Sequence, residues 1–371
     1  MGEEEKEKSL ALEYGGYKHQ ALLYSKLKNI PQKNAVKCKL CSHYCIIKDG
    51  DVGKCLVRKN EKGELFSLAW GKSTGLAIDP IEKKPFFHFK PGASTLSFGT
   101  QGCNFRCLNC QNWTLSQAVR ENMPNALNIP PTTPKQIADA ATQYHVDGIA
   151  YTYSEPTIFF EYARDAILEC RKNNLTKNLF HVFVSNGYFT KEAFELVEKE
   201  KLLQAIRIDL KYMDDEKYWK NSSARLKPVM DSIKRVFNSK NKIHLEIINL
   251  LIPGENDSDE NILQIANFVK SLSPDIPLHF SRFFPYYRMK DKPPTPESTL
   301  IKAKKIAEEI GMNYVYIGNT DLKGAEDTYC PNCSQLLISR SRFGVEKSIF
   351  KEKNISFPPC PKCGHKINII L

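Results

Sequence analysis

The sequence predicts an α/β fold: a partial (β/α)6 TIM-like barrel, with a Cys-rich segment before it and a zinc-ribbon or rubredoxin-like module after it. Between residues 90 and 320, short β-rich runs alternate with longer helical patterns, which is typical of βα units with parallel strands. No G-x-G-x-x-G follows the first strand, which disfavours a dinucleotide-binding sheet. Eleven of the 12 cysteines form three clusters. We therefore expect a leader at 1–89, the barrel at 90–320 and the module at 321–371.

Each barrel element is justified by its local pattern. Strands are expected where β-branched and aromatic residues run together and end in turn residues. The expected strands are Thr95–Gly99, Ile149–Tyr153, Phe180–Ser185, Ala205–Leu210, Ile243–Leu250, Pro277–Phe283 and Tyr314–Ile317. Helices are expected after capping residues, as at Thr133 followed by Pro134. The expected helices are Thr133–His145, Thr157–Lys172, Thr190–Lys199, Ala224–Asn238, Ser258–Leu272 and Pro296–Ile310.

Composition and charge restrict the class of protein. With 42% hydrophobic and 26% charged residues, the chain is globular in composition. The apolar stretch from Ile243 to Pro253 is interrupted by His244 and Glu246, so we expect no membrane span. The start M-G-E-E-E-K-E-K carries no legible secretory signal, so a cytoplasmic protein is expected. The net charge of +11 fits acidic partners, an anionic substrate or a solvated basic surface, but no Lys/Arg run with interleaved aromatics points to nucleic acid.

The central cysteine cluster carries the chemistry. In a reducing compartment, clustered cysteines indicate metal or cluster ligands rather than disulfides. The segment G-T-Q-G-C-N-F-R-C-L-N-C-Q-N-W places Cys103, Cys107 and Cys110 in C-x3-C-x2-C spacing on the loop after the first barrel strand. Three thiolates on one loop suggest a [4Fe–4S] cluster with one iron open to a small molecule. The alternative is a zinc loop with a distant fourth ligand.

This loop resembles that of the radical S-adenosylmethionine (radical SAM) superfamily. The resemblance implies that the open iron binds the amino and carboxylate groups of SAM. It also implies that an electron from the cluster cleaves SAM to a 5′-deoxyadenosyl radical, which abstracts hydrogen from a substrate that the sequence does not identify. A reductant such as ferredoxin or flavodoxin is implied as a partner.

Further strand ends extend the resemblance. The segment Y-S-E-P-T resembles the superfamily's G-G-E-P motif, so Glu155 would receive the SAM ammonium, although Tyr153 and Ser154 stand where two glycines usually lie. The segment is also an ordinary helix start. By similarity to the pyruvate formate-lyase activating enzyme, V-S-N-G-Y would bring Ser185 and Asn186 to the ribose or carboxylate of SAM, although S-N-G is equally a plain turn.

Two further segments supply other candidates. By the same similarity, D-L-K would bring Asp209 and Lys211 to line the SAM site. His279 is a further candidate cofactor-binding residue near the barrel mouth or interior, with a core histidine as the alternative. The I-P-G segment followed by Glu255 resembles a region near adenine.

Longer motifs resemble one subfamily, the AmmeMemoRadiSam system radical SAM enzymes. They are C-S-H-Y-C, D-P-I-E-K-K-P-F-F-H-F-K-P-G and the triplet segment itself. The resemblance implies Memo-like and other proteins of that system as partners. Two alternatives are an activating enzyme of a glycyl-radical enzyme and an RNA-modifying enzyme that binds through its C-terminal ribbon.

The two flanking clusters are candidate metal sites. Four thiolates can close a tetrahedral shell or hold an iron–sulfur cluster, and small polar modules are commonly fixed by metals. The N-terminal set would bind zinc or an auxiliary cluster and consists of Cys38, Cys41, Cys45 and Cys55. The C-terminal set would bind a structural zinc or iron ion and consists of Cys330, Cys333, Cys360 and Cys363. Cys170 stands alone as an expected buried thiol.

Overall fold

The computed structural model describes residues 19–28, 31, 33–341 and 343–371. The charged segment at residues 1–8, on which the expectation of no secretory signal depends, lies outside the described residues. The chain divides into two compact units: unit 1 comprises Met1–Ile78 and Leu96–Gln204, and unit 2 comprises Asp79–Thr95 and Ala205–Leu371. The three-part division of the sequence stays a prediction.

The central strands confirm an α/β fold with a mostly parallel sheet. In unit 1 the strand order is β10-β9-β8-β7, and β10 pairs with β9 in parallel. In unit 2 the order is β14-β13-β12-β11, with parallel pairing throughout. The strands are β7 (Ser73–Pro80), β8 (Ser94–Thr100), β9 (Gly148–Tyr151), β10 (Phe180–Ser185), β11 (Ala205–Asp209), β12 (His244–Leu251), β13 (Leu278–Arg282) and β14 (Val315–Gly318). All seven expected strands are confirmed within a few residues, whereas closure into a barrel stays a prediction.

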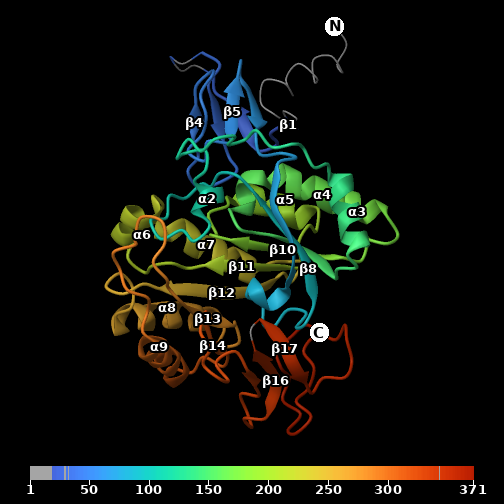
Figure 1. Ribbon diagram of the computed structural model, residues 1–371, viewed down its shortest axis with the longest axis vertical. Helices are drawn as coiled ribbons and strands as arrows, with labels where there is room; N and C mark the ends of the chain where they lie inside the picture. Colours follow the sequence, from blue (N-terminus) through green and yellow to red (C-terminus); the bar gives the residue numbers. More distant parts are fainter. Residues whose placement is uncertain (1–18, 29–30, 32, 342) are drawn as a thin grey trace. The chain divides into compact units, whose positions relative to one another are not determined.

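Helices α3 and α5 of unit 1 begin at sequence-encoded caps. Thr133 and Gln136 form a capping box at the start of α3, and the Thr190 hydroxyl accepts the Ala193 N–H at the start of α5. Helix α3 packs against α4, as can be followed in Figure 1. The helices are α2 (Trp113–Ser116), α3 (Pro134–Gln143), the 3-10 helix η2 (Pro156–Phe159), α4 (Phe160–Lys172) and α5 (Lys191–Lys199).

The leader in unit 1 forms two small antiparallel sheets. One has the order β1-β6-β5 and the other β2-β3-β4. Arg58 of β5 is buried and donates two hydrogen bonds to Glu161 of α4, at 2.9 and 3.0 Å, which ties the leader to the helix. The strands are β1 (His19–Gln20), β2 (Tyr24–Lys26), β3 (Val36–Cys38), β4 (Ile46–Ile47), β5 (Arg58–Glu61) and β6 (Glu64–Ser67).

In unit 2, helices cover the parallel strands. Helix α7 packs against β12, and α9 packs against β13, β14 and α8, as can be followed in Figure 1. Helix α6 was not expected from the sequence, because its mostly polar residues give little helical periodicity; Tyr218 is one of its few buried side chains. The helices are η1 (Ile81–Lys83), α6 (Asp215–Ser222), α7 (Leu226–Phe237), α8 (Asp259–Leu272) and α9 (Glu297–Glu309).

A fully buried carboxylate organises the interior of unit 2. Glu246 of β12 accepts hydrogen bonds from the backbone N–H groups of Phe87 and His88 at 3.0 and 2.8 Å. It also accepts from the ring Nε2 atoms of His244 and His279, at 3.1 and 2.7 Å. Burial would raise the pKa of Glu246, but His244 and His279 hold it well below its usual range. The network ties the segment before β8 to β12 and β13.

The D-P-I-E-K-K-P motif has a structural role in unit 2. Asp79 is paired with Lys83 at 2.7 Å and with Lys84. Glu82 lies 3.7 Å from Arg340 of β16, and both side chains are buried. Arg340 also donates to the backbone carbonyl of Phe87 at 2.7 Å. The motif therefore anchors the C-terminal module.

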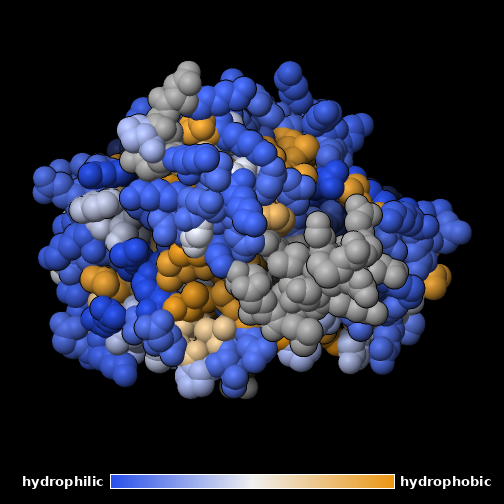
Figure 2. All heavy atoms as spheres, turned by 90° about the horizontal axis from the view of Figure 1, so that it is seen from above, coloured by the Kyte–Doolittle hydropathy of each residue, from blue (hydrophilic) through white to orange (hydrophobic). Residues whose placement is uncertain are grey.

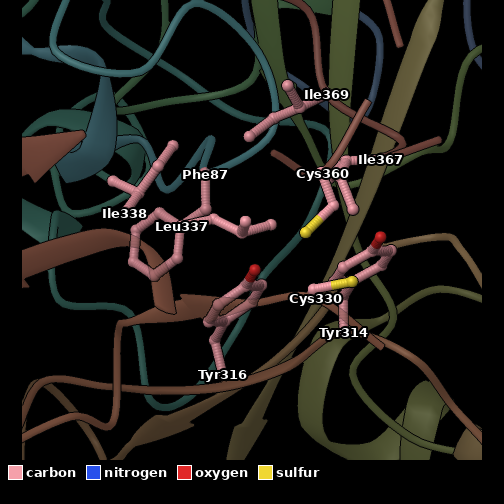
Figure 3. Packing of buried hydrophobic residues seen from close by; sticks show 9 residues of the cluster. All are labelled: Phe87, Tyr314, Tyr316, Cys330, Leu337, Ile338, Cys360, Ile367 and Ile369. Atoms are coloured by element: carbon pink, nitrogen blue, oxygen red, sulfur yellow. The ribbon is translucent and has the colours of Figure 1, made fainter. Parts of the chain in front are cut away.

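Apolar packing completes this anchor. The C-terminal module contains the strands β15 (Thr328–Tyr329), β16 (Leu336–Ser341) and β17 (Gly344–Ser348), joined in an antiparallel sheet. Figure 3 shows that its buried side chains, including two cysteines, gather with aromatic rings from β14 and from the segment before β8. The cluster consists of Phe87, Tyr314, Tyr316, Cys330, Leu337, Ile338, Cys360, Ile367 and Ile369.

Figure 2 shows hydrophilic residues over most of the face that it draws, with hydrophobic residues in a few groups. Within the described part of the chain, no helix combines the length and apolar character that a membrane span requires.

The buried His181 predicts a loss of stability in acid. The residue is 3% exposed, the Tyr151 hydroxyl lies 3.2 Å from its Nδ1, and burial lowers its pKa to about 3. Between pH 6.5 and 3 the unfolded state takes up a proton that the folded state does not, so stability falls as the pH falls. From pH 7 to 5 this group should cost about 2 kcal/mol of unfolding free energy.

Urea unfolding at both pH values measures this effect. His181→Gln should remove about 2 kcal/mol of the pH-dependent loss, and the exposed His145→Gln should keep the wild-type loss. An unchanged loss in His181→Gln would contradict the assignment.

Candidate active site

The cysteine triplet lies on the loop that follows β8 in unit 1. Cys103 is buried, whereas Cys107 and Cys110 are partly exposed, and all three are free thiols. Gly102 has a φ of +96°, and a Cβ there would lie 2.7 Å from the Val57 side chain, so this turn requires glycine. Three thiols thus stand on one loop at the carboxyl end of a sheet strand, where βα folds place their sites.

The Y-S-E-P turn follows β9 in the same unit. A Cβ on Gly99 of β8 would lie 2.5 Å from the Thr152 carbonyl oxygen, so glycine permits the close approach of the turn. Tyr153 has a φ of +64°, a left-handed conformation that glycine adopts without strain. Asn112, just after the triplet, donates to the Tyr153 carbonyl at 2.9 Å. The turn therefore forms although Tyr153 and Ser154 stand where two glycines are usual, and Glu155 lies at its end.

Glu155 is held by four hydrogen bonds from two strand ends. Its Oε1 accepts from the Thr157 N–H at 3.0 Å, the Thr157 hydroxyl at 2.5 Å and the Ser185 hydroxyl at 2.8 Å. Its Oε2 accepts from the Asn186 N–H at 2.7 Å. The structure therefore brings three of the expected SAM-binding residues together, with Ser185 and Asn186 in contact with Glu155.

The electrostatics of Glu155 favour a cationic ligand. The side chain is 1% exposed, and burial raises its pKa even though the hydrogen bonds oppose this rise. Its hydrogen-bond donors, from Thr157, Ser185 and Asn186, are all neutral. A buried carboxylate with neutral donors gains most from a cation such as an ammonium group.

Asn104 joins this carboxylate to the triplet, and sequence reasoning missed it. Its Oδ1 accepts from the Asn186 side chain at 2.7 Å, and its carbonyl accepts from His43 Nε2 at 2.8 Å. A chain of contacts therefore runs from the triplet loop through Asn186 to Glu155. The sequence signal that could have indicated it is an amide side chain between Cys103 and Cys107.

The remaining candidates lie in unit 2. Asp209 ends β11 and is paired with Arg207 at 2.5 Å and Lys211 at 2.7 Å. Burial would raise the pKa of Asp209, but these two cations lower it. His279 forms a hydrogen bond of 2.7 Å with the buried Glu246. Glu255 is paired with Lys292 at 2.8 Å.

The triplet site fits a [4Fe–4S] cluster with SAM. Its donor set is three thiols without a fourth cysteine on the loop, which leaves one iron for an exogenous ligand. Three buried polar atoms on this loop and the preceding strand end have no hydrogen-bond partner: Thr100 Oγ1, Asn104 Nδ2 and Asn109 Oδ1. Buried polar atoms without partners are rare and indicate a group that would satisfy them.

The C-terminal cysteines form a site for a single metal ion. Cys330 Sγ lies 3.6 Å from Cys363 Sγ, and Cys333 Sγ lies 3.8 Å from Cys360 Sγ. All four sulfur atoms lie within 4.8 Å of one another. Zn–S bonds of about 2.3 Å at the tetrahedral angle give sulfur separations of about 3.8 Å. The structure confirms a metal-binding geometry here; the identity of the ion stays a prediction.

The N-terminal cysteines lie on two turns of the leader. Cys38 ends β3, and its N–H donates to the Cys45 carbonyl at 2.9 Å. Three of the four are buried, and burial raises the pKa of Cys55 to about 12. A Cβ on Gly53 would lie 3.8 Å from Cys45 Sγ, which places Cys45 beside the turn that carries Cys55.

Comparisons with known proteins agree with this site. The Radical SAM superfamily profile matches residues 98–266. An uncharacterized protein of Methanocaldococcus jannaschii is 41% identical over 353 residues, covering 95% of this chain and 99% of that protein. A second M. jannaschii protein, whose name groups it with glycyl-radical enzyme activating enzymes, is 28% identical over 210 residues, covering 56% and 74%. The pyruvate formate-lyase-activating enzyme of Staphylococcus aureus is 24% identical over 187 residues, covering 49% and 71%.

The fold, the triplet and these matches define the class: the chain belongs to the radical SAM superfamily and is a radical SAM enzyme. Within the superfamily it is related to proteins named as activating enzymes.

Loss of the C-terminal metal is expected to destabilise the protein. Cys330 and Cys360 belong to the buried cluster that anchors this module, so metal removal would loosen the cluster. Cys333→Ala/Cys363→Ala should bind one metal ion fewer and lower the Tm by about 5 °C or more. Metal analysis and calorimetry measure both effects, with Cys170→Ala as the control. A Tm equal to that of the control would contradict the structural role.

Proposed function

We propose that this protein binds SAM at the triplet site of unit 1 and cleaves it reductively. Cys103, Cys107 and Cys110 would hold a [4Fe–4S] cluster with one iron open to SAM. When bound, the cluster and SAM together would supply a 5′-deoxyadenosyl radical that abstracts hydrogen from the substrate. The observation that carries the proposal is the triplet loop joined, through Asn104 and Asn186, to the buried Glu155.

The chain's own residues bind and orient the methionine end of SAM. Glu155 receives the ammonium group, because its carboxylate has neutral donors only among its hydrogen bonds. Ser185 and Asn186 hold the two carboxylate oxygens of Glu155 in place by hydrogen bonds. We therefore propose that Ser185 and Asn186 position Glu155, in addition to the contacts with the ribose or carboxylate of SAM that the sequence predicts. The role of Asp209 and Lys211 in lining the site stays a prediction.

The subfamily resemblance implies a system and its partner proteins rather than one substrate. We propose an AmmeMemoRadiSam-type system, in which a Memo-like protein or another member is the partner and ferredoxin or flavodoxin supplies electrons. The C-terminal cysteines would hold zinc in a structural role. A second candidate function is activation of a glycyl-radical enzyme, which the similarity to proteins named as activating enzymes favours.

EPR spectroscopy tests the binding site. After anaerobic reconstitution and reduction, SAM should change the [4Fe–4S]⁺ spectrum of wild type and of the control Cys170→Ala. Cys107→Ala should lack this signal. A wild-type spectrum that SAM does not change would contradict the proposal.

Isotope transfer tests the substrate. Deuterium from a labelled Memo-like partner should appear in 5′-deoxyadenosine. Label arriving instead from a glycyl-radical enzyme, together with a glycyl radical signal, would favour the second function.

A further inference from the structure

The N-terminal cysteines lie on turns that contact the active-site loop directly, and all of these residues belong to unit 1. His43, between Cys41 and Cys45, donates from Nε2 to the Asn104 carbonyl at 2.8 Å. A Cβ on Gly102 would lie 3.1 Å from the Cys55 carbonyl oxygen, so this backbone rests against the residue before Cys103. The two cysteine turns therefore touch both sides of the first triplet cysteine.

A third contact lies beyond the triplet. Arg120 donates to the Lys54 carbonyl, next to Cys55, at 2.8 Å. Its other guanidinium nitrogen is directed to Gln117, which donates to the Phe105 carbonyl at 3.2 Å. The turn of Cys55 is thus connected, through Arg120 and Gln117, to Phe105 inside the triplet loop.

The same turns hold the segment that follows β10. The Ser42 N–H donates to the Tyr188 carbonyl at 2.8 Å, and Cys41 forms an isolated antiparallel bridge with Phe189. The Tyr188 ring lies 4.8 Å from the His43 ring and 5.1 Å from the Phe105 ring. This segment begins with Ser185 and Asn186, the residues that hold Glu155.

The strands of the leader's two small sheets, β1 to β6, are two to four residues long, and modules built of such short strands commonly depend on a bound metal. Cys38, Cys41 and Cys55 are buried and reduced, and together with Cys45 they match the thiolate number of a closed metal shell.

We propose that Cys38, Cys41, Cys45 and Cys55 bind a thiolate-held metal centre that braces the active-site loop and the Ser185–Tyr188 segment. The ligand is a zinc ion or an iron–sulfur cluster, since both take four thiolates. By fixing the turns that carry His43 and Cys55, the centre sets Asn104 and Asn186, and through them Glu155. The cysteines are positioning residues, and the inference rests on the proposed function only in taking SAM as the ligand of Glu155.

Metal content tests the site itself. The full chain carrying Cys103→Ala/Cys107→Ala/Cys110→Ala should keep two metal centres, at the two flanking sites. Adding Cys38→Ala/Cys45→Ala should remove one of them, whereas adding Cys170→Ala should remove none. Zinc loss identifies an ion, and joint loss of iron and sulfide identifies a cluster. Unchanged metal content on adding the two alanines would overturn the proposal.

Hydrogen exchange and SAM binding test the brace. In the wild-type triplet background, Cys38→Ala/Cys45→Ala should speed amide exchange at residues 102–107 and 185–189 and raise the SAM Kd roughly ten- to hundredfold, as outer-shell changes do. The Cys170→Ala control should change neither. Unchanged exchange at these residues after the metal is lost would overturn the proposal.

A second variant covers the case in which the double variant does not fold. His43→Phe keeps a ring beside Tyr188 but cannot donate to Asn104, so it should keep its metal and still speed exchange at 102–107. Exchange equal to wild type would overturn the brace. Exchange and metal content are measured without SAM, so failure of wild type to bind SAM would count against the proposed function alone.

Discussion

Replacing Glu155 by glutamine is expected to weaken SAM binding about a hundredfold, which corresponds to roughly 3 kcal/mol for a buried charged contact. The glutamine keeps the size of the side chain but removes the charge that the ammonium would meet. It also places an N–H group toward the Asn186 N–H, which now donates to Oε2 at 2.7 Å. Two effects therefore act in the same direction.

Equilibrium dialysis with the reconstituted protein measures this change. The matched control is Glu195→Gln, an exposed glutamate on α5 whose partner is Lys191, and it should bind SAM as wild type does. Because burial raises the pKa of Glu155, wild-type affinity should also rise with pH as the carboxyl group ionises. A Kd for Glu155→Gln within about twofold of wild type would contradict the role of this carboxylate.

Replacing Glu246 by alanine is expected to destabilise the protein by about 3–5 kcal/mol, as for other buried charged networks that lose one partner. The side chain is fully buried. It accepts hydrogen bonds from Phe87, His88, His244 and His279. Its removal leaves these groups without an acceptor in an apolar interior. It also releases the segment that anchors the C-terminal module.

Urea unfolding measures the effect of the Glu246 substitution. Glu246→Gln should cost less than alanine, because one acceptor oxygen remains. Glu260→Ala, an exposed change on α8, should stay within about 0.5 kcal/mol of wild type. A loss below about 1 kcal/mol for Glu246→Ala would show that the network does not hold unit 2 together.

The sequence was most informative where a short local pattern determines the structure. The strand that ends at Thr100, the capping box of Thr133 and the loop of Cys103 to Cys110 depend on neighbouring residues. The close approach of Gly99 and the left-handed Tyr153 could not be read in the same way, because they depend on backbone from a second strand.

Contacts between residues that are distant in the sequence could not be predicted from local patterns. From the sequence the D-P-I-E-K-K-P motif indicates only a resemblance. Its physical role depends on Arg340 and on Glu246, which lies 159 residues from Phe87 in the sequence. The sequence predicts His279 as a cofactor-binding residue, with a core histidine as the alternative; its Nε2 lies 2.7 Å from Glu246, and the cofactor role stays a prediction. A histidine on a strand does not reveal its partner, because that partner comes from a neighbouring strand.

The most direct test of the account is product formation under anaerobic conditions. Reconstituted protein is reduced with dithionite in the presence of SAM, and 5′-deoxyadenosine is quantified for wild type, Cys107→Ala and the control Cys170→Ala. Wild type and the control should form product, and Cys107→Ala should form none above background. Absence of product from wild type that carries its iron and sulfide, or equal product from Cys107→Ala, would contradict reductive cleavage of SAM at the triplet.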